Sequence, residues 1–505
     1  MTPLNHLSPK LPMALWNSAC SLLLVLLLVL LAVPLLLLPL FLRCVRRSSS
    51  STRPRVLVLV LGDVGRSPRT QYHAVSLASA GFAVDLVGYP GTPPLPAVRN
   101  SPYIRLAYIP APAKLVVVAG GGGGGGGGAS RAARYLLAAV ERSLRQMGQL
   151  LRLTLFELPA PEYILIQNPP AIPSLLLGQY LRLALGSKLV IDWHNFGFSI
   201  MALNLGARSL IVRMATLYEK NVGRFATAHI CVSKAMAREL RTRWRVGGSV
   251  TTMYDKSPSH FRRLSVPEIH EFATRYSFST AVLTLITTTP PSPPARGLLT
   301  HLDASGRPQL TPTRPALIVS STSWTEDEDF GILLDALVEY DREAEANAEK
   351  RVRDVVLVIT GKGPLQAGYV DRIARLKMTR VRILTAWLTA EDYPLLLGAA
   401  DLGISLHTSS SGVDLPMKIV DMFGCGLPVC AVDYPCLREL VEDGDNGRVF
   451  GTAGELCKHL QELLSINDDG GRLAELRKGA ATFADTRWHD AWMQDVAPLF
   501  GVVGK

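Results

Sequence analysis

The sequence predicts an α/β protein with two Rossmann-like domains that face each other across a cleft, preceded by an N-terminal transmembrane helix. Short runs of Val, Ile and Leu recur along both halves of the chain and alternate with helical patterns, which is typical of parallel sheets covered on both faces. A separate uncharged apolar segment near the N-terminus predicts the membrane helix. The 505 residues are enough for two such domains and an anchor.

The apolar segment runs from Leu22 to Leu42 and consists almost wholly of Leu, Val, Ala and Pro. About 20 such residues can cross a hydrocarbon core of roughly 30 Å, so we expect a tail over 1–20 and a transmembrane anchor over 21–42. A cleaved signal peptide is the alternative, but arginines rather than a small-residue cleavage site follow the segment. By the positive-inside rule, this basic cluster places the tail in the lumen and the rest of the chain in the cytosol.

The net positive charge of the chain bears on which kind of ligand or partner it binds. The net charge is +11, with 19% charged and 48% hydrophobic residues. Clustered Lys and Arg can bind nucleic acid, but no nucleic-acid-binding motif accompanies the charge, so we expect no nucleic-acid partner. An anionic membrane surface and diphosphate ligands account for the same charge. The seven cysteines show no metal-ligand spacing, and reduced thiols in a cytosolic core are the simpler interpretation.

The first domain is expected over 54–255. A polyglycine run at 120–128 cannot join a core and is interpreted as a surface insertion. The helical segment 131–155 carries arginines among leucines, and it fits an interfacial membrane helix and an ordinary domain helix equally well. The buried strands are predicted at Arg55–Leu61, Ala83–Val87, Tyr163–Gln167, Lys188–Asp192 and Ala228–Val232.

The second domain is expected over 256–482, followed at 483–505 by a C-terminal helix that packs back toward the first domain. A Pro-, Thr- and Ser-rich stretch at 287–315 is interpreted as a solvated loop. The residues 325–328 match a capping box that would open a helix. The buried strands are predicted at Ala316–Ser321, Val355–Thr360, Val381–Leu384, Leu402–Leu406 and Pro428–Val432.

Ligands of open α/β sheets bind beyond the carboxyl ends of the strands. In the first domain, Gly62, Gly65, Arg66 and Arg69 follow the first strand at the start of a helix, where backbone amides and guanidinium groups can bind a diphosphate. A plain tight turn with surface arginines is the alternative. Two further residues at strand ends are candidates for a general base, and each could equally be a hydrogen-bonded loop anchor: Asp63 and His194.

In the second domain, a lysine between glycines (Gly361, Lys362) can place an ammonium against a nucleotide diphosphate, although a solvated turn lysine has the same pattern. A Ser-rich loop leads into a helix that opens near Pro416, and Asp421 on that helix could accept ribose hydroxyls. We assign the following residues to binding of the donor nucleotide: Ser323, Gly361, Lys362, Ser411, Gly412, Asp414, Lys418 and Asp421.

Five segments together resemble the chitobiosyldiphosphodolichol β-mannosyltransferase family of GT-B glycosyltransferases: GDVGRSPRTQYHA, YILIQNPPAIPSL, LVIDWHNFGFSIMAL, SSTSWTEDEDFGILLDAL and SSSGVDLPMKIVDMFGCGLPV. The resemblance extends over most of 55–450. It implies a GT-B fold and an inverting transfer of mannose from GDP-mannose, in β-1,4 linkage, to dolichol-linked diphosphate chitobiose. In that family this is the first mannosylation of the lipid-linked oligosaccharide for protein N-glycosylation, on the cytosolic face of the endoplasmic reticulum.

The resemblance also bears on site residues and partners. It implies an acceptor diphosphate near Gly65, Arg66 and Arg69, and GDP near Lys362, the Ser-Gly loop and Asp421. It implies no tightly bound cofactor, contact with endoplasmic reticulum lipid, and association with other mannosyltransferases of the pathway. No metal ligand is assigned, and the sequence does not decide a divalent metal requirement.

Two rival functions stay open at this point. One is a GT-B enzyme that uses another nucleotide sugar, which donor-binding measurements would distinguish. The other is a catalytically silent subunit that only anchors a complex. The joint presence of Lys362, Asp421 and the Ser-Gly loop counts against a silent subunit, because such a protein needs no complete donor site.

Overall fold

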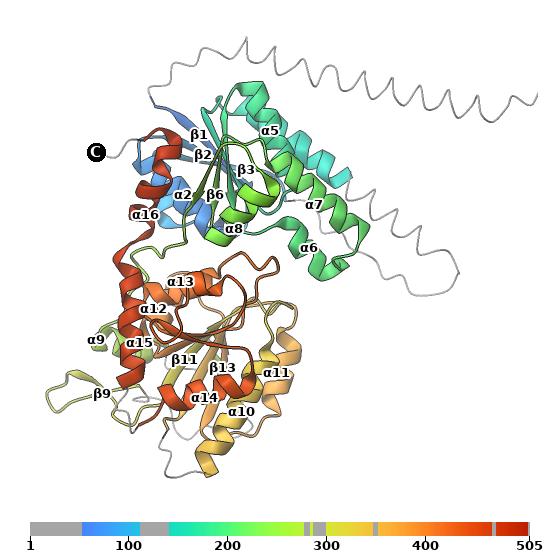
Figure 1. The fold of residues 1–505 in the computed structure, drawn as a ribbon. Coiled ribbons are helices and arrows are strands. Elements are labelled where there is room, and N and C mark those ends of the chain that lie inside the picture. The colour runs from blue at the N-terminus through green and yellow to red at the C-terminus, as the bar shows by residue number, and fades with distance from the viewer. Residues whose placement is uncertain are drawn as a thin grey trace, which may run out of the picture.

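The computed structural model describes residues 53–111, 141–276, 283–285, 299–346, 352–466 and 471–502. Within them the chain forms two α/β domains, one above the other in Figure 1, with the C-terminal segment running along one side of both. The expected tail, the anchor over 21–42 and the polyglycine run lie outside the described residues. None of the helices that the structure describes has the length and apolar character needed to cross a membrane.

The first domain is a seven-stranded parallel sheet in the order β3-β2-β1-β4-β5-β6-β7. Its strands are β1 (Arg55–Asp63), β2 (Ala83–Tyr89), β3 (Ile104–Tyr108), β4 (Tyr163–Asn168), β5 (Lys188–Trp193), β6 (Ala228–Cys231) and β7 (Ser249–Thr252). Its helices include α2 (Pro68–Ser79), α3 (Pro96–Arg99), α5 (Ser174–Leu185), α6 (Gly197–Leu205), α7 (Leu210–Gly223) and α8 (Lys234–Glu239). Residues 141–152 form a further helix.

The second domain repeats this plan with a seven-stranded sheet in the order β16-β15-β14-β11-β12-β13-β8, in which β8 is antiparallel to β13. Its strands are β8 (Leu283–Leu285), β11 (Ala316–Ser321), β12 (Val355–Thr360), β13 (Val381–Ala386), β14 (Leu402–Ser405), β15 (Val429–Val432) and β16 (Gly447–Phe450). Its helices are α9 (Val266–Tyr276), α10 (Phe330–Ala346), α11 (Gln366–Ala374), α12 (Asp392–Ala399), α13 (Met417–Gly424), α14 (Ala453–Leu463) and α15 (Gly471–Thr482).

All ten predicted strands are confirmed to within two residues at each end. Each of them was predicted from a continuous apolar run. Strands of this kind lie in the middle of the sheets and are buried on both faces, as β11 and β12 show with every residue buried. The sequence missed β3, β7, β8 and β16, which lie at sheet edges and mix polar with apolar residues. An edge strand is covered less completely, so it needs no unbroken apolar run.

Two local expectations were wrong. The helix α10 begins at Phe330 rather than at the supposed capping box, because Glu328 turns inward and is 2% exposed. The second half of the 287–315 stretch is not a plain loop. It forms the antiparallel hairpin of β9 (Thr300–Leu302) and β10 (Pro308–Leu310), with Leu299 buried beneath it.

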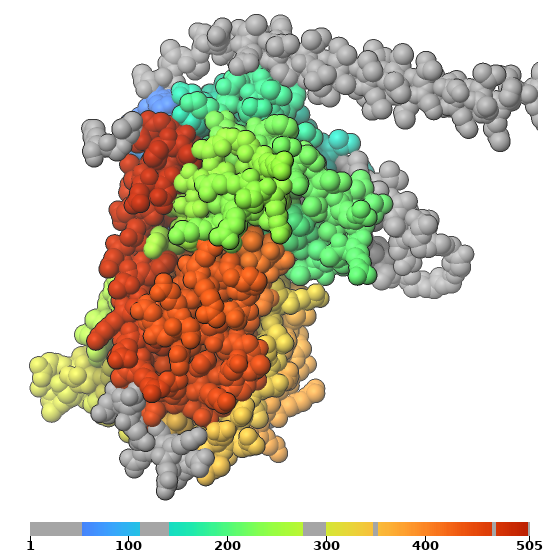
Figure 2. All heavy atoms as spheres, viewed as in Figure 1, coloured from blue at the N-terminus to red at the C-terminus, as the bar shows by residue number. Residues whose placement is uncertain are grey.

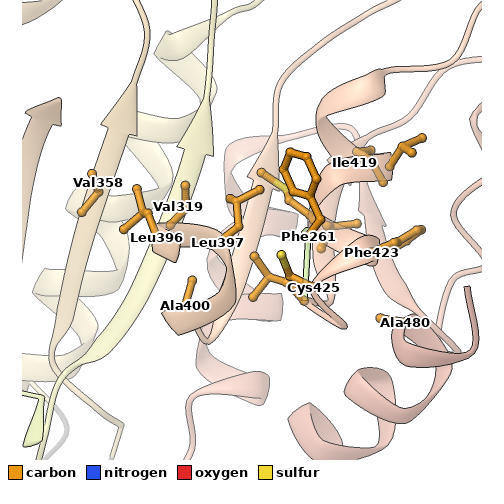
Figure 3. Close-up of a cluster of buried hydrophobic side chains, with 14 of the residues drawn as sticks. Phe261, Val319, Val358, Leu396, Leu397, Ala400, Ile419, Phe423, Cys425 and Ala480 are labelled. Carbon is orange, nitrogen blue, oxygen red and sulfur yellow. The ribbon is translucent and has the colours of Figure 1, made fainter. Parts of the chain in front are cut away.

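The core of the second domain includes a cluster between one face of its sheet and the helices α12 and α13 (Figure 3). Phe261 from the segment that enters this domain packs into the cluster beside Ile419 and Phe423 of α13. The cluster also contains Leu396 and Leu397 of α12. Because α13 is fixed by these contacts, the loop that precedes it has a defined position at the edge of the sheet.

The chain crosses between the domains twice, after β7 and again before α16 (Trp488–Asp495), which packs against α2. Figure 2 shows the C-terminal segment in red along one side of both domains. Trp492 donates its indole N–H to Nδ1 of His73 at 2.9 Å, inside the first domain's core. The two crossings touch, because Nζ of Lys256 lies 3.7 Å from the centroid of the Phe483 ring.

Candidate functional site

The carboxyl ends of the two sheets face each other, and their loops are in direct contact. The loop after β5 meets the Ser-rich loop after β14: Asn195 Nδ2 donates to Ser410 Oγ at 3.2 Å, and Ser199 Oγ lies 3.0 Å from the same atom. The hydroxyl of Ser233, after β6, donates to the carbonyl of Val413. The two walls of the cleft predicted from the strand ends are therefore in contact through these loops.

On the second domain, two loops stack so closely that glycine is required. A Cβ at Gly361 would collide with the carbonyl oxygen of Thr322, and one at Gly363 with that of Ser323. The exposed Lys362 between them extends its ammonium over the ring of Trp387, 4.7 Å from the centroid. The structure thus places Ser323, Gly361 and Lys362 together at the carboxyl edge, with a cation beside an exposed aromatic ring.

A buried carboxylate joins this region to α13. Glu328 accepts the backbone N–H of Ser323 at 2.9 Å, and it also accepts the hydroxyl of Thr322 and the ammonium of Lys418. Lys418 is therefore already paired, and its predicted contact with the donor is not tested by this arrangement. From the sequence we expected Glu328 to belong to a capping box, so its role in joining these two regions was missed.

The Ser-rich loop is held by an Asp–His–Asp arrangement. Asp414 accepts hydrogen bonds from the hydroxyls of Ser409 and Ser411, and its carboxylate lies 3.6 Å from Nε2 of His407. The other ring nitrogen of His407 lies 2.9 Å from Asp327. Burial alone would lower the pKa of His407, but these two carboxylates outweigh it and raise the pKa to about 9. His407 is therefore an imidazolium at neutral pH.

Gly412 has a φ of +74°, in the region that favours glycine, and this lets the loop turn back toward α13. Asp414 holds the two serine hydroxyls and so shapes the loop. The predicted contact of Ser411, Gly412 and Asp414 with the donor stays a prediction. Neither His407 nor Asp327 was singled out from the sequence. The signal was present, since His407 lies two residues beyond the end of β14 at the carboxyl edge.

Asp421 lies on α13, after the Ser-rich loop. The residue is only partly buried as a whole, yet protein surrounds its carboxyl, and burial together with the nearby Asp255 raises its pKa well above the usual range. The pKa values of Tyr72 and Tyr393 are raised mainly by burial. A negative charge on Asp421 would raise both pKa values further. Asp421 therefore lies close enough to Tyr72 of α2 and Tyr393 of α12 to affect their pKa values, and its contact with ribose stays a prediction.

On the first domain, Asp63 braces two loops. Its carboxylate accepts the backbone N–H of Gly65 at 3.0 Å, and the N–H and hydroxyl of Thr92 at 2.9 and 3.0 Å. Gly65 approaches Thr92 so closely that any Cβ there would collide with the Thr92 carbonyl. Of the two alternatives for Asp63, this geometry favours the loop anchor over the general base.

The two arginines after β1 have different environments. The side chain of Arg66 is 70% exposed at the edge of the cleft, with Nε 3.2 Å from Thr92 Oγ1. Arg69 is 1% exposed. It binds Asp192 through two hydrogen bonds of 2.9 and 2.8 Å and Asp255 through one of 2.6 Å. Contrary to the expectation for an acceptor diphosphate, Arg69 is committed to internal carboxylates.

The carboxylate of Asp192 is also shared by two histidines. Nε2 of His73 lies 3.2 Å from it, and Nε2 of His194 lies 3.4 Å from it. Burial would raise the pKa of Asp192, but Arg69 and then His73 hold it well below the usual range. The side chain of His194 is 19% exposed, so a partly accessible imidazole has an ionised carboxylate behind it. His194 therefore stays a candidate for the general base, with a carboxylate oxygen 3.4 Å from its ring.

A cavity of about 910 Å³ opens between α2 and α3 of the first domain and α12 and α16. Its lining is mainly apolar, with Tyr72, Leu95, Pro394 and Trp488 among the contributing side chains. Tyr72, which lines this cavity, lies close enough to Asp421 for that carboxylate to contribute to its raised pKa.

One group among the described residues has metal-ligand spacing: Glu339, Glu343 and Cys457, whose ligand atoms lie within 4.8 Å of one another. It lies on α10 and α14, away from the strand ends that form the cleft. Gln461 already donates to Glu343 at 2.6 Å and to Cys457 at 3.4 Å. We assign no metal to the cleft.

Comparisons with known proteins agree with this architecture. The model of the family "Glycosyl transferase 4-like domain" matches residues 65–253, and that of "Glycosyl transferases group 1" matches residues 316–466. Among solved structures, Thermosynechococcus elongatus sucrose-phosphate synthase covers 89% of this chain and 98% of its own, with a TM-score of 0.55 and 15% identity. Anabaena HepE in complex with UDP-glucose covers 89% and 100%, with a TM-score of 0.54 and 18% identity. These similarities show the GT-B fold alone.

Curated relatives are much closer in sequence. The mouse chitobiosyldiphosphodolichol beta-mannosyltransferase is 43% identical over 92% of this chain and 93% of its own. The human protein of the same name is 41% identical over 94% and 98%. The Arabidopsis thaliana UDP-glycosyltransferase TURAN is 40% identical over 88% and 97%.

Proposed function

The chain belongs to the chitobiosyldiphosphodolichol β-mannosyltransferase family of GT-B glycosyltransferases, and from this membership we propose that it transfers mannose from GDP-mannose, in β-1,4 linkage, to dolichol-linked diphosphate chitobiose. The observation that carries the proposal is the contact between the loop after β5 and the Ser-rich loop after β14. It brings His194 of one domain to the same cleft edge as the His407 loop of the other, which is the arrangement that direct transfer between two bound substrates needs.

In the proposed inverting step, the acceptor hydroxyl attacks the anomeric carbon of mannose while the bond to the β-phosphate oxygen breaks. The hydroxyl proton passes to His194, and GDP leaves with the bonding electrons. Nε2 of His194 faces Asp192, so Nδ1 is the nitrogen that accepts the proton. The carboxylate behind it stabilises the imidazolium that forms.

The growing charge on GDP needs cations that are already in place. Lys362 and the His407 imidazolium supply them in this proposal, and the amides that begin α13 add favourable dipoles. The proposal includes no tightly bound cofactor, with GDP-mannose as the donor substrate. Arg66, exposed beside the β1 loop, is the residue that we propose for the acceptor diphosphate.

A different nucleotide sugar is the competing function, and one relative is named a UDP-glycosyltransferase. We expect GDP-mannose to raise the melting temperature of the purified full chain more than UDP-glucose or UDP-N-acetylglucosamine does, since a ligand that binds the folded state stabilises it. Transfer of labelled sugar to a diphosphate-linked chitobiose lipid should show the same order. A larger shift with a UDP-sugar would exclude the mannose assignment.

Lys362→Ala provides a matched check on the donor site. It should weaken the GDP-mannose shift, whereas Lys377→Ala, which removes another exposed lysine of the same domain, should leave it unchanged. An equal effect of both substitutions would indicate a general charge effect and would contradict a specific role for Lys362.

We also propose a single-pass position in the endoplasmic reticulum membrane with both domains cytosolic. The support is the uncharged Leu22–Leu42 segment with arginines behind it. Protease added to intact microsomes should digest the two domains and spare the first residues of the chain. Protection of the domains would reverse the orientation. Association with other mannosyltransferases of the pathway belongs to the same proposal, and co-purification from solubilised membranes tests it.

A further inference from the structure

The helices α6 and α7 lie on an outer flank of the first domain (Figure 1). They carry an exposed apolar surface. Seven large apolar side chains there are between 39% and 69% exposed: Ile200, Leu203, Leu205, Leu210, Ile211, Met214 and Leu217. We call this set the α6–α7 apolar face. Contiguous surfaces of this kind are unusual on soluble proteins and indicate a partner or a membrane.

The sequence of the two helices explains why the face is exposed. On α7, Leu210, Met214 and Leu217 recur at helical spacing on one side, while Val212, Ala215 and Glu219 are buried on the other. The helix therefore has apolar side chains both toward the core and toward solvent. On α6, only Ser199 is buried, although most of its residues are apolar.

The charges around the face have one sign. Residues 197–225 contain four basic side chains and one acidic side chain. The acidic one, Glu219, is 1% exposed, so it adds little to the outer surface. Arg208 and Arg213 are exposed, and they lie between the helices and on α7. An apolar face bordered by arginines matches a bilayer surface with anionic lipids.

Hydrogen bonds connect the α6–α7 apolar face to the loop that lies at the cleft. Glu219 of α7 accepts the backbone N–H groups of Gly197 and Phe198 at 2.9 and 3.0 Å, which holds the first turn of α6. The residue just before that turn is Phe196, and Asn195 before it donates to Ser410 across the cleft. The apolar face thus begins a few residues from the point where the two domains meet.

We propose that the α6–α7 apolar face inserts into the surface of the lipid bilayer and holds the mouth of the cleft at the membrane. The meaning of this contact rests on the proposed lipid-linked acceptor, whose diphosphate would lie at the depth of the lipid headgroups. The membrane-bound face then presents the acceptor to His194 without extraction of its isoprenoid chain from the bilayer.

The test uses the full chain in vesicles. An environment-sensitive fluorophore is attached to Met214→Cys and, as a matched control, to Leu302→Cys on the β9 hairpin, which is exposed to a similar degree at 61% against 54%. The parent chain is labelled in parallel as a blank for its native cysteines. The vesicles contain phosphatidylcholine with or without phosphatidylserine, and spin-labelled lipid is the quencher.

We expect a blue shift and several-fold stronger quenching at position 214 than at position 302. Phosphatidylserine should strengthen the quenching, and Arg213→Glu should weaken it. A water-like spectrum at position 214, with quenching no stronger than at position 302, would overturn the proposal. So would an efficient bis-maleimide crosslink between two copies through position 214 without quenching, since it would assign the face to a second copy of the chain.

This assay contains no nucleotide sugar, so its result is independent of donor identity. An enzyme that proved to use another sugar could still insert the face, and a true mannosyltransferase could fail to insert it. As a second variant, Met214→Asp should lower transfer to a long-chain lipid acceptor in vesicles several-fold and leave transfer to a short-chain acceptor in detergent unchanged. Equal loss with both acceptors would contradict a role at the membrane.

Discussion

Nδ1 of His407 lies 2.9 Å from a carboxylate oxygen of Asp327, which ties the loop after β14 to the loop after β11. On its other side the imidazole faces Asp414, which in turn holds the hydroxyls of two loop serines. One cationic ring therefore organises the part of the second domain that faces the first. Its charge state should control both the stability of this loop and its attraction for a diphosphate.

The first prediction concerns pH. The folded state raises the pKa of His407 from 6.5 to about 9, so its stabilising contribution is complete below pH 6.5 and is lost as the pH rises through about 9. We expect the melting temperature of the full chain to fall relative to His407→Gln between about pH 7 and about pH 10. If the melting temperatures of the two proteins changed equally with pH over this window, His407 would not be charged in the folded state.

The second prediction separates the two candidates for the general base. His194→Ala should lower kcat by about 100-fold or more with little change in the KM for GDP-mannose. Asp192→Asn should also lower kcat, because it removes the charge behind His194, although it disturbs Arg69 as well. Asp63→Asn should mainly lower thermal stability, since it weakens the bracing of Thr92. A tenfold or larger fall in kcat for Asp63→Asn alone would reverse the assignment.

The third prediction concerns Arg69. Arg69→Met leaves Asp192 and Asp255 buried without their partner, which should cost about 3–5 kcal/mol of stability. Arg66→Met, at the exposed neighbour, should change stability by no more than about 0.5 kcal/mol. Thermal and chaotrope melts of the full chain measure both. Equal stabilities of the two variants would show that the buried network is not formed.

The fourth prediction compares two glycines of the second domain. Gly363→Ala places a methyl group against the carbonyl oxygen of Ser323, so the two loops must separate. Both the melting temperature and the affinity for GDP-mannose should fall. Gly368→Ala, in α11, meets no atom within 4 Å and should be neutral or slightly stabilising, because alanine favours a helix. If Gly363→Ala kept its affinity for GDP-mannose, these two loops would not be part of the donor site.

Much of the fold could be predicted because central parallel strands must be apolar throughout. Ala316–Ser321 and Val355–Thr360 were located to the residue for this reason. Edge strands such as Ser249–Thr252 gave no such signal, since one side is not covered by another strand. The supposed capping box failed because Glu328 finds a better partner in Lys418, 90 residues away, than in its own helix start.

For the candidate site, the sequence located the loops but not the pairing of charges. The rule for strand ends correctly brought Ser323, Lys362 and the Ser-rich loop to one edge. It could not show that the Arg69 side chain points into the protein. Its carboxylate partners Asp192 and Asp255 are 123 and 186 residues away in the chain. Long-range ion pairs leave no local pattern, so an arginine that binds phosphate and one that is buried in an ion-pair network look alike in sequence.

The contact between Lys256 and Phe483 has a mechanical consequence. Both polypeptide connections between the domains pass through this one place. We therefore expect an opening of the cleft to be a hinge motion about an axis near this contact. The Asn195–Ser410 hydrogen bond should then break when the cleft opens. A chain cut short before Trp488 would keep a single connection, and the two halves could also twist against each other.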